Sequence, residues 1–276
     1  MRDARRLSAD RWRVAGGHVV LGGLGLLCAV PVYWLFATSL RRPEDVTSTA
    51  PLPWPLSLQN YADAWAVLDV PGLLLNTIVM AGLIAAGQLL VGLLAAYAFA
   101  AWDLRGARVL HLAFVATWLV PFQVTMLPNY VLLKQLGLLD TIAGVVVPNL
   151  CSALGVIMLR QHLLGFPREL LDAARMDGRG SWRILWTVVV PNIGPALASL
   201  AILLFVSAWN EYCWPALVLR RSAGVLQLGL RGFMGTEGTD WGPMMATAGL
   251  SCLPILLLYL VLQRRIVDGF VRSGLK

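Results

Sequence analysis

Six charge-free apolar runs divide this chain, and they constrain its fold more than any other feature. They cover residues 14–40, 70–102, 109–133, 141–159, 184–210 and 241–263. Each run reaches the ~17 to 25 residues that a helix needs to cross a bilayer. Hydrophobic residues make up 58% of the 276 residues and charged residues only 13%, unlike the composition of a soluble domain. The sequence therefore predicts an all-α membrane protein with six transmembrane helices.

The basic residues are distributed unevenly between the two sides of these runs. Sixteen of the 22 Lys and Arg residues lie before the first run, between the second and third, between the fourth and fifth, or after the sixth. Loops rich in Lys and Arg stay in the cytoplasm, so both termini are predicted to be cytoplasmic, with tails at 1–13 and 271–276. The net charge of +7 then reflects topology. The chain has no dense basic run with interleaved aromatic residues, so nucleic-acid binding is not expected.

Catalytic and metal-binding motifs are missing from the sequence. The two lysines, Lys134 and Lys276, do not form the G-x-x-x-x-G-K-[ST] pattern of a phosphate-binding loop. The histidines lack i, i+4 spacing and the cysteines lack CxxC spacing, so no metal site is predicted. A secondary transporter usually has ionisable residues within its spans, and the six runs contain no Asp, Glu, Lys or Arg. We therefore expect a chain that is not an enzyme and holds no cofactor. A secondary transporter or membrane scaffold is the less favoured alternative.

The second run contains a stripe of small residues at four-residue spacing. These residues are Gly92, Ala96 and Ala100. Such a stripe lets two helix backbones approach closely, so it predicts a packing face toward another helix.

A polar segment, residues 166–195, separates the fourth and fifth runs. Pro167 is expected at the first position of a helix, with Glu169 and Asp172 placing negative charge in its first turns. Gly178 is expected to stop this helix, and Ser181 to cap the next one. The helix is predicted to be amphipathic, and the apolar residues expected on one face are Phe166, Leu170, Leu171 and Ala174.

The order of residues in this segment resembles the EAA loop of ABC importer permeases, the family of binding-protein-dependent transport inner-membrane components. The matching residues are Asp172, Ala173, Ala174, Asp177, Gly178, Pro191 and Pro195. The resemblance implies a type I importer permease fold in which this helix docks in a cleft of a cytoplasmic ATPase and transmits its closure. The coupling residues would be Glu169, Asp172, Ala173, Ala174, Asp177 and Gly178. Asp172 stands where the family usually has Glu, and Arg179 stands where it usually has a small residue.

Two other segments carry polar residues near membrane depth. In the third run, Pro121 and Pro128 are expected to interrupt the helix, a pattern that resembles the family's external gate region. The end of the fifth run, AWNEYCWP, resembles a motif of carbohydrate-importer permeases. The predicted pathway residues are Gln123, Asn129, Tyr130, Trp209, Asn210 and Glu211. Helix kinks in the first segment and interfacial anchoring in the second are the alternative interpretations.

The resemblance extends from about Asn76 to Gly269, so a permease domain is predicted at 71–270, after a first transmembrane helix and external connector at 14–70. It implies that the chain forms half of a translocation pathway for a sugar or sugar-like solute. The implied partners are a homologous second permease, two copies of a cytoplasmic ATPase that bind ATP and Mg, and an external solute-binding protein. Import of glycerol 3-phosphate or a glycerophosphodiester is the alternative, because the run IMLRQHLLGFPRELLDAARMDG also resembles permeases of those systems.

Overall fold

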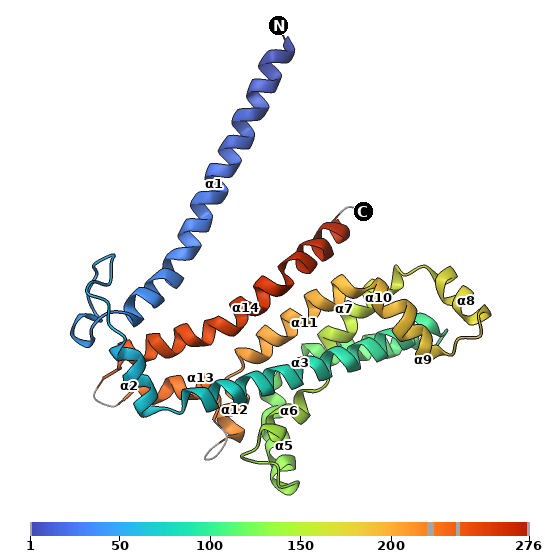
Figure 1. Cartoon of the computed structure of the whole chain (residues 1–276). Helices are drawn as coiled ribbons and strands as arrows, with labels where there is room; N and C mark the ends of the chain where they lie inside the picture. Colours follow the sequence, from blue (N-terminus) through green and yellow to red (C-terminus); the bar gives the residue numbers. More distant parts are fainter. Residues whose placement is uncertain (1, 220–223, 236–237, 275–276) are drawn as a thin grey trace. The chain divides into compact units, whose positions relative to one another are not determined.

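The computed structural model describes residues 2–219, 224–235 and 238–274. In this part of the chain the regular secondary structure is helical, apart from one isolated bridge between Met234 and Thr239. Arg220, Arg221 and Lys276, which contribute to the predicted charge distribution, lie outside the described residues. In chain order the helices are α1 (Arg2–Ser39), η1 (Pro43–Asp45), α2 (Gln59–Val67), α3 (Val70–Ala101), α4 (Ala107–Leu119), α5 (Phe122–Gln135), α6 (Ile142–Val146), η2 (Val147–Asn149), α7 (Ala153–Leu164), α8 (Arg168–Met176), α9 (Ser181–Ile184), η3 (Leu185–Val189), α10 (Val190–Asn192), α11 (Gly194–Trp209), α12 (Cys213–Val218), α13 (Leu226–Gly229), η4 (Leu230–Phe233) and α14 (Trp241–Gly274) (Figure 1).

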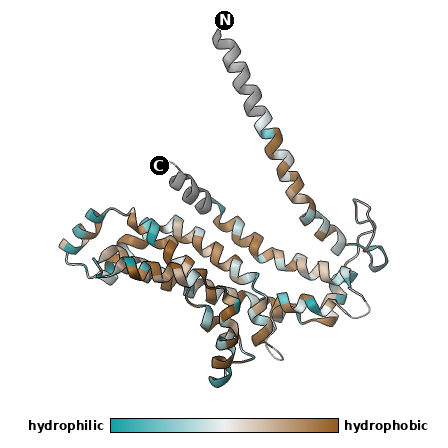
Figure 2. Ribbon diagram, turned by 180° about the vertical axis from the view of Figure 1, so that it is seen from behind, coloured by the Kyte–Doolittle hydropathy of each residue, from teal (hydrophilic) through white to brown (hydrophobic). Residues whose placement is uncertain are grey.

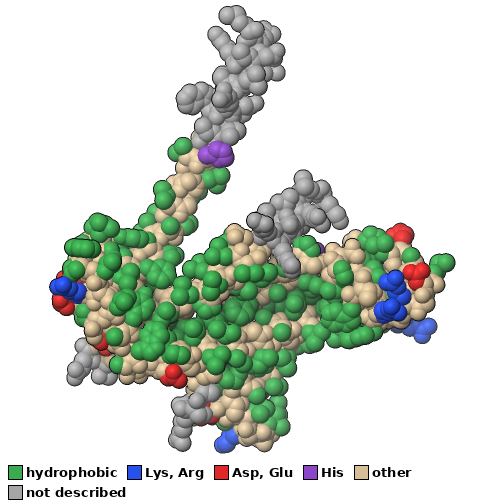
Figure 3. Space-filling model, viewed as in Figure 1, with side chains coloured by type: hydrophobic (Ala, Val, Ile, Leu, Met, Phe, Trp, Pro, Cys, Tyr) green, Lys and Arg blue, Asp and Glu red, His purple; other side chains and the backbone are tan. Residues whose placement is uncertain are grey.

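Four of these helical segments are long and apolar enough to cross a membrane without a break. They are Gly16–Ser39, Val70–Ala101, Gly194–Val218 and Trp241–Gln263. Two further pairs of helices are each bent at a short break: α4 with α5, and the segment α6–η2 with α7. With each pair counted as one span, the candidate spans number six, in agreement with the six apolar runs. Hydrophobic side chains are spread over much of the described surface in this view, and the charged side chains lie in a few places near its edges (Figure 3). Side chains such as Leu83, Leu257 and Val261 are exposed, as expected of helices whose outer faces meet lipid.

The chain forms two compact units. The first comprises Met1–Asp69 and Gly232–Cys252, and the second comprises Val70–Arg231 and Leu253–Lys276. The core of the second unit is built on α3, which packs against α7 and α11 (Figure 1). Gly92 allows the backbones of α3 and α7 to approach closely, because a Cβ at this position would lie 3.1 Å from the carbonyl carbon of Gly155 on α7. Ala96 is fully buried in a hydrophobic cluster that also contains Leu159 on α7 and Leu200 on α11. The predicted stripe therefore does pack against another helix, and that helix belongs to this chain.

The third apolar run is broken at Pro121, where α4 and α5 meet at 90°. Val120 adopts an extended conformation, which is the usual effect of a proline on the residue before it. The prediction that Pro128 also interrupts the run is wrong, because Pro128 lies inside α5. A proline removes one backbone hydrogen bond and can be accommodated as a kink when the flanking residues keep helical dihedral angles. The fourth run is bent by 44° between η2 and α7.

The first unit joins the end of α1, the connector that follows it, α2 and the start of α14. Asn60 on α2 is its central polar residue, and its Nδ2 donates hydrogen bonds to the carbonyls of Ser39 (3.0 Å) and Arg41 (2.8 Å). The guanidinium of Arg41 donates to the carbonyls of Ser48 and Ala50 and lies 4.7 Å from the ring centroid of Trp34. The bonds from Asn60 satisfy carbonyls at the end of α1 and just after it, and the bonds from Arg41 hold the connector against this end.

Candidate functional site

The polar segment predicted to couple to an ATPase folds as α8, followed by a tight turn. Pro167 is the N-cap of α8, so its predicted place at the first helical position is wrong by one residue. Gly178 ends the helix as predicted, with a φ of 75° in the left-handed region. The amide of Gly178 donates to the carbonyl of Arg175 (3.0 Å), and the amide of Arg179 donates to that of Ala174 (3.1 Å). This pair of bonds is a Schellman motif, which favours glycine because a Cβ is costly at positive φ.

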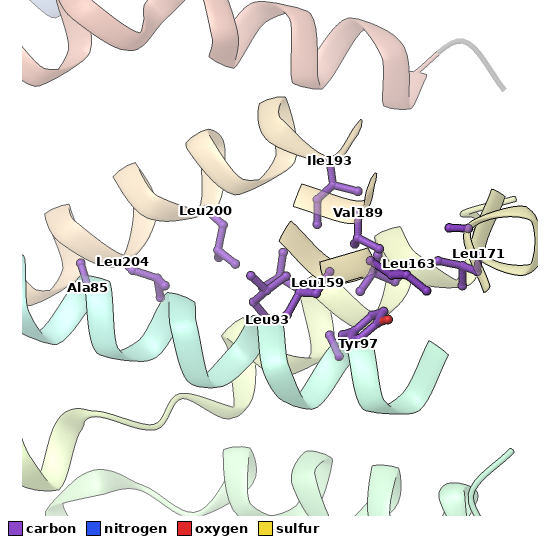
Figure 4. Close-up of a cluster of buried hydrophobic side chains, with 14 residues drawn as sticks. Ala85, Leu93, Tyr97, Leu159, Leu163, Leu171, Val189, Ile193, Leu200 and Leu204 are labelled. Atoms are coloured by element: carbon purple, nitrogen blue, oxygen red, sulfur yellow. The ribbon is translucent and has the colours of Figure 1, made fainter. Parts of the chain in front are cut away.

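The two faces of α8 have different environments. Leu171 and Ala174 are each 5% exposed and pack into the core cluster of the second unit. Figure 4 shows Leu171 at one end of that cluster, next to Leu163 and Val189. Leu170 is 44% exposed, so its predicted place on the buried face is wrong. It lies about 100° around the helix from Leu171, and the buried face is too narrow to include it.

The outer face of α8 is exposed. Met176 is 90% exposed. Glu169, Asp172, Ala173 and Asp177 are also exposed. In the view of hydropathy in Figure 2, hydrophilic residues gather on α8, whereas most other helices are mainly hydrophobic. Of the predicted coupling residues, only Ala174 faces inward.

Arg175 attaches α8 to the end of α3, and the sequence interpretation did not include it. Its Nη1 lies 2.9 Å from Oδ1 of Asp172, and its Nη2 donates to the carbonyl of Ala101 (2.7 Å). Ala101 is the last residue of α3, where helix carbonyls lack intrahelical partners. Asp172 is thus already paired within the chain. The acid three residues before an arginine was a signal for this pair, but nothing in the local sequence indicates the contact with Ala101.

A second contact ties the following helix to α3. The hydroxyl of Tyr97 donates to the carbonyl of Ser181 (3.0 Å) at the start of α9. Ser181 was expected to cap this helix, but it is the first helical residue, and the N-cap is Gly180, which has no side chain to bond the free amides. The Tyr97 bond therefore fixes the position of a helix start that lacks a side-chain cap. The chain continues through the π-helix η3 into α10 and α11.

We expect Arg175→Gln to lower solute transport by about threefold to tenfold, because hydrogen bonds to charged groups are worth ~1.5 to 3 kcal/mol and this side chain is partly exposed. Gln cannot reach Asp172 and the Ala101 carbonyl together, so motion of α8 would be passed less directly to α3. Arg175→Lys, which keeps the charge, is the matched control and should retain more transport. The measurement is uptake per ATP hydrolysed in the reconstituted complex. A ratio equal to that of the parent for Arg175→Gln would contradict the role.

The two predicted pathway segments, which are far apart in sequence, pack on one hydrophobic cluster. Trp209 at the end of α11 is buried, and so is Trp214 on α12. The Trp214 ring lies 5.6 Å from the ring of Phe122 at the start of α5, in an edge-to-face arrangement. Tyr130 on α5 packs against the same cluster. Gln123 is exposed and Asn129 is half-buried on α5.

Glu211 and Asn210 make local contacts in this region. Oε1 of Glu211 accepts a hydrogen bond from the amide of Trp214 (3.2 Å), so its carboxylate fixes the start of α12. Asn210 is exposed, and its Nδ2 donates to the carbonyl of Val206 (2.9 Å). Gln227 was missed by the sequence interpretation. Its Nε2 donates to the carbonyl of Trp209, and its buried Oε1 accepts no hydrogen bond among the described residues.

A cavity of about 740 Å³ lies at the two helix bends in the second unit. It is lined by α4, by the start of α5 and by the residues that begin α7, including Phe114, Thr117, Pro121, Phe122, Cys151 and Ser152. The lining is mainly apolar with two hydroxyl groups. The predicted interruption at Pro121 thus opens space at the bend, next to the segment that carries Gln123.

These features define a class of protein. The chain is a polytopic membrane protein with bent spans, a cavity at the bends, and an amphipathic helix attached to the end of a span with its polar face free. A family model described as "Binding-protein-dependent transport system inner membrane component" matches residues 88–272. The chain belongs to this family, the permease subunits of ABC importers.

Individual relatives support the assignment over nearly the whole chain. The sn-glycerol-3-phosphate transport system permease protein UgpE of Yersinia pestis bv. Antiqua (strain Antiqua) is 32% identical over 268 residues, covering 93% of this chain and 95% of that protein. The arabinooligosaccharides transport system permease protein AraQ of Halalkalibacterium halodurans is 33% identical over 190 residues, 68% of each chain. The crystal structure of a bacterial ABC transporter involved in import of the acidic polysaccharide alginate contains a chain that matches this fold. That match has a TM-score of 0.80 and 26% identity, and it covers 94% of this chain and 98% of that one.

Proposed function

We propose that this chain forms half of the translocation pathway of an ABC importer for a sugar or sugar-like solute. A homologous second permease would supply the other half. Two copies of a cytoplasmic ATPase would bind ATP and Mg and supply the energy, and an external binding protein would deliver the solute. This chain would carry out no catalysis. The observation that carries the proposal is α8, whose inner face is fixed to α3 and the core while its outer face is free to enter an ATPase cleft.

The experiment that tests this proposal uses the chain alone and in its complex. The purified chain is expected to hydrolyse no ATP above background, since it has no phosphate-binding loop. The complete complex in lipid nanodiscs should hydrolyse ATP, and loaded binding protein should stimulate the rate. The proposal would be refuted if the chain alone hydrolysed ATP at a substantial rate, or if the loaded binding protein did not change the rate of ATP hydrolysis by the complex.

A second candidate solute is glycerol 3-phosphate or a related phosphodiester. The observation in its favour is that the UgpE proteins align with 93% of this chain, whereas AraQ aligns with 68%. The two solutes can be distinguished by ATP hydrolysis in the complete complex. The binding protein is offered a neutral oligosaccharide in one assay and glycerol 3-phosphate in another, and the transported solute is the one that stimulates hydrolysis.

The charge distribution predicts that both termini and α8 lie on the cytoplasmic side, and that the segments 41–69 and 210–240 lie outside. The side of the membrane on which each segment lies can be measured with single cysteines. Thr49 and Ser181 are both exposed, and each is changed to Cys in a variant from which the four native cysteines have been removed. A membrane-impermeant thiol reagent added to intact cells should modify Thr49→Cys, and it should modify Ser181→Cys only after the membrane is opened. The reverse pattern would show that the orientation is wrong.

A further inference from the structure

A cavity of about 410 Å³ with a mixed polar and apolar lining lies within the first unit, between the turn after α1, the helix α2 and the start of α14. Two carboxylates, Asp63 and Asp240, line it, with the hydroxyl residues Thr47 and Thr239. Its lining contains no Lys, Arg or His among the described residues. Asp63 accepts a hydrogen bond from Nε2 of Gln59 (2.7 Å), and neither carboxylate forms an ion pair in the part of the chain that the structure describes. The cavity therefore presents two carboxylates that have no cationic partner among the described residues.

The two basic residues of the connector before Asp63 are engaged elsewhere. Arg41 is buried, stacks on Trp34, and donates to two backbone carbonyls of the connector. Arg42 lies 4.0 Å from Glu44. The chain has a net charge of +7, whereas the charged residues that line this cavity are acidic. A cationic partner would gain electrostatic energy there.

Asn60 gives an independent indication of a missing donor. It lines the cavity, is 0% exposed, and directs Nδ2 away toward the carbonyls of Ser39 and Arg41. Its Oδ1 lies on the other branch of the amide, close enough to Gly242 on the cavity wall that a Cβ at that residue would clash with it. Oδ1 accepts no hydrogen bond among the described residues. A buried carbonyl oxygen without a donor is unfavourable, and a donor entering the cavity would relieve this.

The chemistry of the cavity fits an ammonium or guanidinium group better than a metal ion. Two carboxylates, an amide oxygen and hydroxyl oxygens are acceptors for such a group. The described residues contain no cluster of three or more His, Cys, Asp or Glu that could hold a metal ion. The volume of about 410 Å³ is also far larger than a single ion needs. It can admit a long side chain whose charged end reaches the two aspartates.

We propose that this cavity receives a Lys or Arg side chain of the external solute-binding protein. The proposal rests on the proposed function for the identity of the partner and for the external location of residues 41–69 and 232–240. The family to which the chain belongs is defined by dependence on a binding protein. A cationic side chain in an acidic cavity would set the orientation of docking and speed the encounter.

The test uses the complete complex in nanodiscs and the binding protein of the same transport system. The variant Asp63→Asn/Asp240→Asn keeps the shape of both side chains and removes both charges. We expect the Kd of the binding protein to rise about 10-fold or more and its dependence on salt to weaken, because paired charges at an interface govern both. Hydrolysis at saturating binding protein should stay close to the parent rate. Asp45→Asn removes an exposed acid of the same connector that is outside the cavity lining and forms no ion pair among the described residues, so it is the matched control and should leave the Kd unchanged.

A second measurement identifies the side chain. Each exposed Lys and Arg of the binding protein is changed in turn to Glu, and one such variant should bind Asp63→Lys/Asp240→Lys more tightly than the parent binding protein does. If the Asp63→Asn/Asp240→Asn variant had the same Kd and the same salt dependence as the parent complex, the cavity proposal would be overturned and the importer function would remain. Absence of any stimulation in the parent complex would overturn both.

Discussion

Ala173→Trp is expected to abolish most solute transport while leaving the chain folded and inserted. Ala173 is exposed on the outer face of α8, so an indole at this position has room within the chain. It would instead project from the surface proposed to enter the ATPase cleft. Overpacking a close interface costs ~1 to 3 kcal/mol, which corresponds to a loss of about 5-fold to 150-fold in association with the ATPase. The measurements are uptake in cells and co-purification of the ATPase with the tagged chain.

The neighbouring alanine is the internal comparison for this experiment. Ala174 is 5% exposed and packs on the core, so Ala174→Trp should lower the yield of folded chain rather than the docking step alone. Ala173→Ser, with a small increase in volume, should transport at close to the parent rate. Full transport and normal ATPase recovery by Ala173→Trp would show that this face of α8 does not enter a close interface.

Gly178→Val is expected to lower transport strongly, through the backbone rather than through a clash. No heavy atom lies within 4 Å of a Cβ built at Gly178, so space is available. The φ of 75°, however, places a β-branched residue in the left-handed region at a cost of roughly 1 to 2 kcal/mol. The strain would be relieved by changing the turn after α8, which would misdirect both α8 and the entry into α9. Uptake should fall by about 10-fold at this energy, with normal membrane insertion.

Gly178→Asn is the matched control, because Asn tolerates the left-handed region better than other residues with a Cβ. Uptake by Gly178→Asn should therefore be much closer to the parent rate than uptake by Gly178→Val. Equal uptake by the Val and Asn variants would mean that the conformation of this turn does not matter for coupling. Substrate-stimulated ATP hydrolysis, measured beside uptake, separates loss of coupling from loss of assembly.

Local features of the sequence predicted the helices well where a short pattern is sufficient. The six apolar runs correspond to the candidate spans, the glycine at 178 ends α8, and the Gly92 stripe packs against a helix. The motif around Asp172 also indicated the family that residues 88–272 match. These features depend on the length of an apolar run, on the φ preference of single residues and on residue spacing within a few helical turns. All three can be read from the sequence without knowledge of the fold.

Pro121 and Pro128 show where local patterns stop being sufficient. Both prolines disfavour a continuous helix by the same mechanism, yet the structure breaks at the first and continues through the second. Likewise, spacing alone placed Leu170 with Leu171, and packing on the core selected the narrower face with Ala174. In each case the outcome depends on which neighbours a residue meets.

By itself, the sequence determined that the chain is a helical membrane protein with a short amphipathic helix stopped by Gly178, and it indicated the permease family. Only the tertiary structure showed that Arg175 bonds the carbonyl of Ala101, that Phe122 meets Trp214, and that Asp63 and Asp240 line one cavity. The physical reason is separation along the chain. Helix formation and termination depend on residues within one or two turns, whereas these contacts join residues that only the folded chain brings together.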